Sequence, residues 1–243
     1  MITVINIKKL RIPALILLLF LMITAIIIII VNGRTSPDPV PAMASVSACP
    51  TLVIDAGHGG ADGGASAADG TVESLVNLQI ALRMEQLAKL FGVPTVMTRT
   101  DETLDYPPEA GTIREMKLWD QRTRIALINA TENAILISIH QNTYPDARPS
   151  GSQVLYAKTD GSPEFAELAH ANLICALNPE NRRVAAPISD RIYLMKRVNC
   201  PAILVECGFL SNPQETAKLK TVEYQTELAA VLMGSYLQYI GEN

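Results

Sequence analysis

The sequence predicts an α/β fold: a mostly parallel twisted sheet with helices on both faces, preceded by one N-terminal transmembrane helix. Short apolar runs alternate with longer segments of helical periodicity, and no internal repeat interrupts this alternation. A long uncharged stretch near the N-terminus, followed by a Pro- and Ser-rich segment, separates the membrane helix from the folded domain. We therefore divide the chain into residues 1–11, 12–31, 32–49 and 50–243.

The segment 12–31 contains 20 residues by the printed sequence, with only Pro13 and Thr24 interrupting its apolar character. About 20 apolar residues span a bilayer, and the three basic residues within 1–11 predict a cytoplasmic N-terminus. A cleaved signal peptide is the alternative, because Ala42-Met43-Ala44 resembles a cleavage site. In both cases the domain that follows is exported.

Residues 32–49 read as a linker, and 50–243 have the length of one large domain. Residues 1–44 hold four of the 20 basic residues and one of the 24 acidic residues, which leaves 16 basic against 23 acidic, a net charge of −7. Such a domain repels nucleic acid, so we expect no nucleic-acid partner.

The predicted strands are apolar runs bounded by turn residues, at 52–55, 93–98, 135–139, 153–157 and 202–205. The predicted helices have apolar residues on one face, at 73–91, 112–131, 163–178 and 212–239. The first of them ends at Gly92 before Pro94. The last begins with the cap Asn212-Pro-Gln-Glu215 and continues as one helix to about Tyr239.

The four cysteines contain no Cys-x-x-Cys pair, which argues against a thiolate metal site. They are Cys49, Cys175, Cys200 and Cys207. An exported location permits disulfides in three possible pairings, and burial as free thiols is the alternative.

The first strand runs directly into the glycine-rich loop Asp55-Ala-Gly-His58-Gly-Gly60. The loop is not a nucleotide-binding loop, because Ala65-Ser66 stands where Lys and then Ser or Thr are needed, and Asp62 replaces the third glycine of a dinucleotide fingerprint. A histidine at the tip of such a loop can reach a metal or a ligand. A turn histidine without a role is the alternative.

Two further polar residues follow predicted strands: His140 after 134–139, and Glu206 after 202–205. Ligands of open α/β sheets bind beyond the carboxyl ends of the strands, so these side chains and His58 should meet at one edge. The chain has three histidines, and two of them lie there. The third, His170, falls in the middle of a helix and is assigned no role.

Glu73 opens the first long helix, whose first turn should lie beside His58 if the helix returns along the sheet. Its alternative explanation is the favourable helix dipole. Two histidines, one carboxylate and a water form an open tetrahedral zinc site, and these ligands suit zinc better than calcium or magnesium. We therefore predict one zinc ion on His58, Glu73 and His140.

Glu206 can then act as general base and general acid, since zinc lowers the pKa of bound water and a nearby carboxylate can move its proton. A loop-capping glutamate is the alternative. Asp55 either orients His58 or serves the turn after the strand.

Several phrases together resemble the zinc-dependent N-acetylmuramoyl-L-alanine amidase family, from about Thr51 to the C-terminus. They are Asp55-Ala-Gly-His-Gly-Gly60, Val72-Glu73, Asn77-Leu-Gln79, Met97-Thr-Arg99, Ser138-Ile-His-Gln-Asn142 and Glu206-Cys-Gly-Phe-Leu-Ser-Asn-Pro213. The resemblance implies zinc ligands at His58, Glu73 and His140, with Glu206 as the catalytic acid/base. It also implies cleavage of the amide between the lactyl group of muramic acid and the L-alanine of the peptide stem.

The short anchor and single domain, without wall-binding repeats, are similar to the germination-specific amidases of endospore formers. This likeness implies a role in cortex peptidoglycan and muramic-δ-lactam formation. Ser74 stands where many members have Lys, and Gln141 where Ala or Leu is common. Neither change removes a ligand. Arg99 and Asn142, near strand ends, are expected substrate contacts.

The expected partners are a peptidoglycan strand with its peptide stem and, through the anchor, the membrane. A protein partner stays open. The domain is expected outside the cytoplasm, in the wall or the forespore intermembrane space, or secreted if the segment is cleaved. Two alternative functions are a zinc peptidase or deacetylase acting on another wall bond, and a non-catalytic membrane-anchored wall-binding protein.

Overall fold

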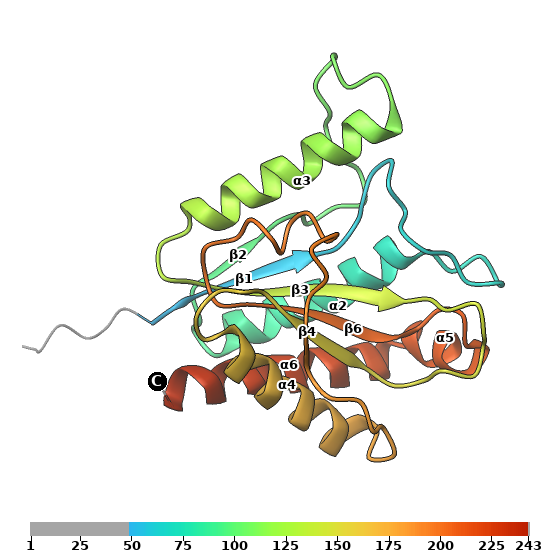
Figure 1. Ribbon diagram of the computed structural model, residues 1–243, viewed down its shortest axis with the longest axis vertical. Helices are drawn as coiled ribbons and strands as arrows, with labels where there is room; N and C mark the ends of the chain where they lie inside the picture. The colour runs from blue at the N-terminus through green and yellow to red at the C-terminus, as the bar shows by residue number, and fades with distance from the viewer. Residues whose placement is uncertain (1–48, 243) are drawn as a thin grey trace, which may run out of the picture. The chain divides into compact units, whose positions relative to one another are not determined.

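The first predicted strand, an apolar run after Pro50, forms β1 (Thr51–Ala56) inside a six-stranded sheet of order β2-β1-β3-β6-β4-β5. The computed structural model describes residues 49–242 (Figure 1). The other strands are β2 (Thr95–Met97), β3 (Ala134–Asn142), β4 (Gln153–Tyr156), β5 (Ala186–Pro187) and β6 (Ala202–Phe209). β1 has parallel neighbours on both sides and is almost wholly buried, which explains its uninterrupted apolar run.

The sheet is mixed. β2, β1, β3 and β6 are mutually parallel, as predicted, but β4 pairs antiparallel with β6. The physical reason is the connection from β3 to β4, which contains no helix and returns the chain along the sheet from the same edge. The short strand β5 extends this reversed part by pairing parallel with β4.

Helices cover both faces of the sheet, as predicted. On one face lie α2 (Glu73–Leu90), α4 (Ser162–Leu177) and α6 (Val222–Glu242) (Figure 1). These helices pack on alternate residues of the central strands. On the other face lie α3 (Ile113–Ala130) and the irregular segment 188–200. Neighbouring residues of β1 show the alternation, since Ile54 faces the first layer and Val53 the second.

The single C-terminal helix of the prediction is wrong, because α5 (Pro213–Leu219) and α6 are separate helices. The Asn212 side chain accepts hydrogen bonds from two backbone N–H groups at the start of α5, as its cap sequence indicates. At the junction, the Thr221 hydroxyl accepts from the Tyr224 N–H and begins α6. A second N-cap so soon after the first therefore divides the segment.

All four cysteines lie within the described part of the chain and are free thiols, so none of the predicted disulfide pairings occurs there. Cys200 and Cys207 are buried. Within residues 49–242, every helix is too short or too polar to cross a bilayer. The predicted anchor at 12–31 and the linker at 32–49, Cys49 apart, lie outside the described residues and stay predictions.

Candidate metal-binding and catalytic site

His58 follows β1 in a left-handed backbone conformation, with φ of 61°. The guanidinium of Arg124 stabilises this turn by donating to the His58 carbonyl oxygen at 2.6 Å. Gly57 allows the close approach of β3, because a Cβ there would lie only 2.3 Å from Nε2 of His140. The loop therefore needs glycine beside its histidine to bring the two imidazole rings together.

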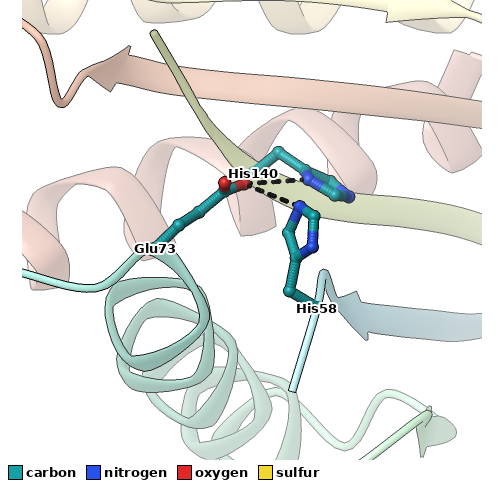
Figure 2. A group of neighbouring side chains, drawn as sticks. All are labelled: His58, Glu73 and His140. Atoms are coloured by element: carbon teal, nitrogen blue, oxygen red, sulfur yellow. Dashed lines mark hydrogen bonds and ion pairs between the residues drawn. The ribbon is translucent and has the colours of Figure 1, made fainter. Parts of the chain in front are cut away.

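Glu73 is the first residue of α2, and its carboxylate joins the two histidines (Figure 2). Its Oε1 lies 3.1 Å from Nδ1 of His140 and 3.3 Å from Nε2 of His58. The same oxygen accepts the Gln141 backbone N–H at 3.1 Å, while Oε2 accepts the Ala65 N–H at 2.8 Å. One donor atom from each of His58, Glu73 and His140 lies within 4.8 Å of the others, a spacing that can hold a metal ion.

The charges of this cluster favour a cation. Burial opposes ionisation of Glu73, but the two histidines outweigh it and hold the pKa of the carboxyl well below its usual range. Burial also disfavours the charged form of His58, yet Asp62 and Glu73 raise its pKa to about 9. A metal ion must displace this proton, so metal binding to His58 should strengthen as the pH rises.

Asp62, and not Asp55, orients His58. Its Oδ2 lies 2.9 Å from Nδ1 of His58, and Lys117 holds the same oxygen from α3 at 2.7 Å. Because a carboxylate only accepts, Nδ1 carries a proton toward Asp62, and the proton that a metal must displace is the one on Nε2, which faces Glu73. The sequence analysis missed Asp62 as a site residue. The signal in the sequence is a carboxylate four residues after the histidine. In the structure, two backbone hydrogen bonds between Gly59 and Asp62 close the loop and bring this carboxylate back to His58.

Asp55 instead belongs to a buried ionic network under the loop. Arg124 donates to Asp55 at 2.9 Å and to Asp120 at 2.8 Å, and it reaches the Ala56 carbonyl at 2.6 Å. Ser138 donates to the other Asp55 oxygen. The network ties α3 to the end of β1 and so fixes the position from which the histidine loop departs.

Glu206 lies beside His140, since the two residues are register partners on β6 and β3. Its Oε2 is buried without a hydrogen-bond partner, and burial raises the pKa of its carboxyl, with Glu73 adding to this effect against the attraction of His140. Glu206 lines a cavity of about 590 Å³ together with His58, Glu73 and His140. A partly buried carboxyl of raised pKa in such a cavity is suited to proton transfer.

Of the two expected substrate contacts, Asn142 lines the cavity. Arg99 does not: it is 5% exposed and donates to the carbonyl groups of Ala56, Gly57 and Ser74. These hydrogen bonds stabilise the backbone around the histidine loop. The structure therefore does not support a substrate contact by Arg99. His170, which was assigned no role, is buried in α4 within 2.9 Å of the Arg183 carbonyl oxygen.

The family model described as N-acetylmuramoyl-L-alanine amidase matches residues 52–234, which is most of the chain. The chain belongs to this amidase family. The match confirms the predicted family and enzyme class, and it covers the whole cavity with its cluster of histidines and carboxylates.

Relatives of the amidase agree in sequence and fold. The germination-specific N-acetylmuramoyl-L-alanine amidase of Bacillus subtilis is 37% identical over 194 residues, covering 79% of this chain and 80% of its own. The N-acetylmuramoyl-L-alanine amidase LytC of the same organism is 27% identical, and the match spans 35% of its length. The CwlD amidase of Clostridioides difficile, solved in complex with the GerS lipoprotein, has a TM-score of 0.76 at 32% identity, covering 80% of this chain and all of that one.

Replacing Asp62 by Asn should weaken binding of Zn²⁺ about 10–100-fold, because the His58 ring loses the carboxylate that orients it. Calorimetric titration of the full-length protein with Zn²⁺ measures this change. Asp69→Asn is a matched control, since Asp69 pairs with Lys220 outside the cavity. Because the Asn oxygen can still accept the Nδ1 hydrogen bond, an unchanged affinity in Asp62→Asn would show that the charge of the Asp62 carboxylate is dispensable.

The Asp55 network should make the free energy of unfolding depend on pH in the acid range. Burial alone raises the pKa of Asp55, but Arg124, Ser138, His140 and Thr98 lower it to about 2 from 3.8. A depressed pKa gives stability that is present above pH 4 and is lost as the pH falls toward 2, an effect of about 2 kcal/mol.

Thermal melting of the wild type and Asp55→Asn between pH 2 and pH 7 tests this sign. The variant should be destabilised at pH 7 by ~3–5 kcal/mol, because it breaks a buried ion pair, and should lose less stability in acid. If the two proteins lost equal stability between pH 7 and pH 2, Asp55 would be ruled out as the source of the pH dependence.

Proposed function

We propose that the protein hydrolyses the amide bond between N-acetylmuramic acid and L-alanine in peptidoglycan, using one zinc ion on His58, Glu73 and His140. One observation carries this proposal: Glu206, whose carboxylate oxygen Oε2 is buried without a hydrogen-bond partner, lines the same cavity as three clustered metal-compatible donors. A wall-binding protein without catalysis needs neither feature.

The residues fit zinc. Two imidazole nitrogens and one carboxylate oxygen form the donor set of a catalytic zinc site, which leaves a coordination position open. Gly57 and Gly64 provide room for these donors, because a Cβ at Gly64 would lie 2.5 Å from Glu73 Oε2. The donors are also oriented in advance by Asp62 and by the N–H groups that bind Glu73.

A zinc ion held there would supply a water of lowered pKa and would polarise the substrate carbonyl. Glu206 accepts a proton from the attacking water and donates it to the leaving nitrogen. Its raised pKa helps it to retain the proton between these two steps. Asp62 keeps Nδ1 of His58 protonated, so that Nε2 is the nitrogen available to the metal.

The likeness to a germination-specific relative supports action on spore-cortex peptidoglycan and a part in muramic-δ-lactam formation. The CwlD structure contains a lipoprotein, which supports a protein partner for this chain also. We further propose that residues 12–31 anchor the protein with its amidase domain outside the cytoplasm.

The anchor is tested by fractionating cells that produce the full-length protein. It should stay with membranes after an alkaline carbonate wash and keep its N-terminal residues by intact-mass measurement, because a helix of that length is held by its apolar surface. Release as a soluble chain that begins near residue 45 would instead demonstrate signal cleavage.

Replacing Glu206 by Gln should lower kcat about 10²–10⁴-fold with Zn²⁺ still bound, because the variant cannot move the proton. Turnover of a defined muropeptide by full-length protein, followed by mass spectrometry, measures the loss and identifies the cleaved bond. His140→Ala should instead lose the metal, as elemental analysis would show.

Release of an intact peptide that begins with L-alanine identifies the amidase reaction. Products cleaved within the peptide, or acetate without peptide, would identify a peptidase or a deacetylase. Full activity in Glu206→Gln would remove this residue from the mechanism.

A further inference from the structure

In the cavity lined by His58, Glu73 and His140, acidic residues outnumber lysine and arginine. Five carboxylates line it: Asp55, Asp62, Glu73, Asp120 and Glu206. Its lysine and arginine residues are Lys117, Arg124 and Arg191. An anionic substrate group that enters such a cavity is repelled unless a cation is available to it.

Two of the three cations are already engaged. Lys117 pairs with Asp62 at 2.7 Å, and Arg124 pairs with Asp55 and Asp120. The Arg191 guanidinium, in contrast, has no hydrogen-bond or ion-pair partner among residues 49–242. It is therefore the cation that the cavity offers to a ligand from the described part of the chain.

Arg191 belongs to the segment 188–200, which is held firmly on the sheet. Leu194 and Met195 of this segment are buried in the core beneath α3. The charged neighbours of Arg191 are also occupied: Asp190 pairs with Lys158 at 2.9 Å, and the Arg197 guanidinium lies 3.6 Å from the centre of the Tyr193 ring. The segment thus presents Arg191 to the cavity without neutralising it.

We propose that Arg191 binds a carboxylate of the peptide stem and makes the enzyme prefer stems in which that carboxylate is free. This inference rests on the proposed function, which places the scissile amide beside His58 and His140. The acidic residue that follows L-alanine in the stem is then only about 3.5 Å further along an extended chain. An arginine suits this contact, because its planar fork can bind a carboxylate through two hydrogen bonds.

Two synthetic muropeptides test the proposal, identical except that the α-carboxylate of the stem glutamate is free in one and amidated in the other. The full-length protein supplied with Zn²⁺ should have the higher kcat/KM on the free acid. Arg191→Gln should lose about tenfold on the acid and little on the amide, which removes the preference. Arg191→Lys should keep part of it, and Arg191→Glu should favour the amide.

Lys196→Gln is the matched control. Lys196 is an exposed cation of the same segment, but it lies outside this cavity, so its loss should leave the preference unchanged. An equal ratio of the two kcat/KM values in the wild type and Arg191→Gln would overturn the role of Arg191 while the proposed function stands. Hydrolysis of neither substrate by the wild type would overturn the proposed function, and this inference with it.

Discussion

The site depends on one shared oxygen, Oε1 of Glu73, which lies between the imidazoles of His58 and His140 (Figure 2). A buried carboxylate is costly unless opposite charges and hydrogen bonds compensate it. Here the backbone N–H groups of Ala65 and Gln141 bind it, one at each oxygen. Because these groups come from the loop after β1, the start of α2 and the end of β3, satisfying one carboxylate requires three distant segments to meet.

This arrangement gives a structural role to Gln141, which stands where Ala or Leu is common in the family that the sequence resembles. The Gln141 amide nitrogen donates to the Asn77 side chain, and Asn77 in turn donates to the Gly57 carbonyl oxygen. This chain of hydrogen bonds joins β3, α2 and the histidine loop. The residue that departs from the common family pattern therefore supports the ligand positions without joining the ligand set.

The sequence predicts the parts of the site that follow from strand periodicity. His58, His140 and Glu206 each follow an apolar run, and parallel strands place their carboxyl ends at one edge. The sequence does not predict contacts that depend on how loops close. Asp62 reaches His58 only because the loop folds back on itself. Arg99 turns inward because the backbone carbonyl groups there need hydrogen-bond donors. Periodicity also carries no information on the reversal of β4, since alternation shows which face of a strand is buried and not the direction in which the strand runs.

The charge of the domain constrains how it can recognise a wall polymer that itself carries carboxylates. Residues 45–243 have a net charge of −7, so the domain as a whole gives no attraction toward such a substrate. At physiological ionic strength this repulsion is screened within about 8 Å, and contacts inside the cavity decide binding. Attraction must then come from local cations: the metal proposed for the His58–Glu73–His140 cluster and, in the same cavity, an arginine that no carboxylate of the described chain neutralises. An acidic enzyme can in this way select an acidic substrate. Its few positive charges contact the substrate only when the correct bond lies at the site.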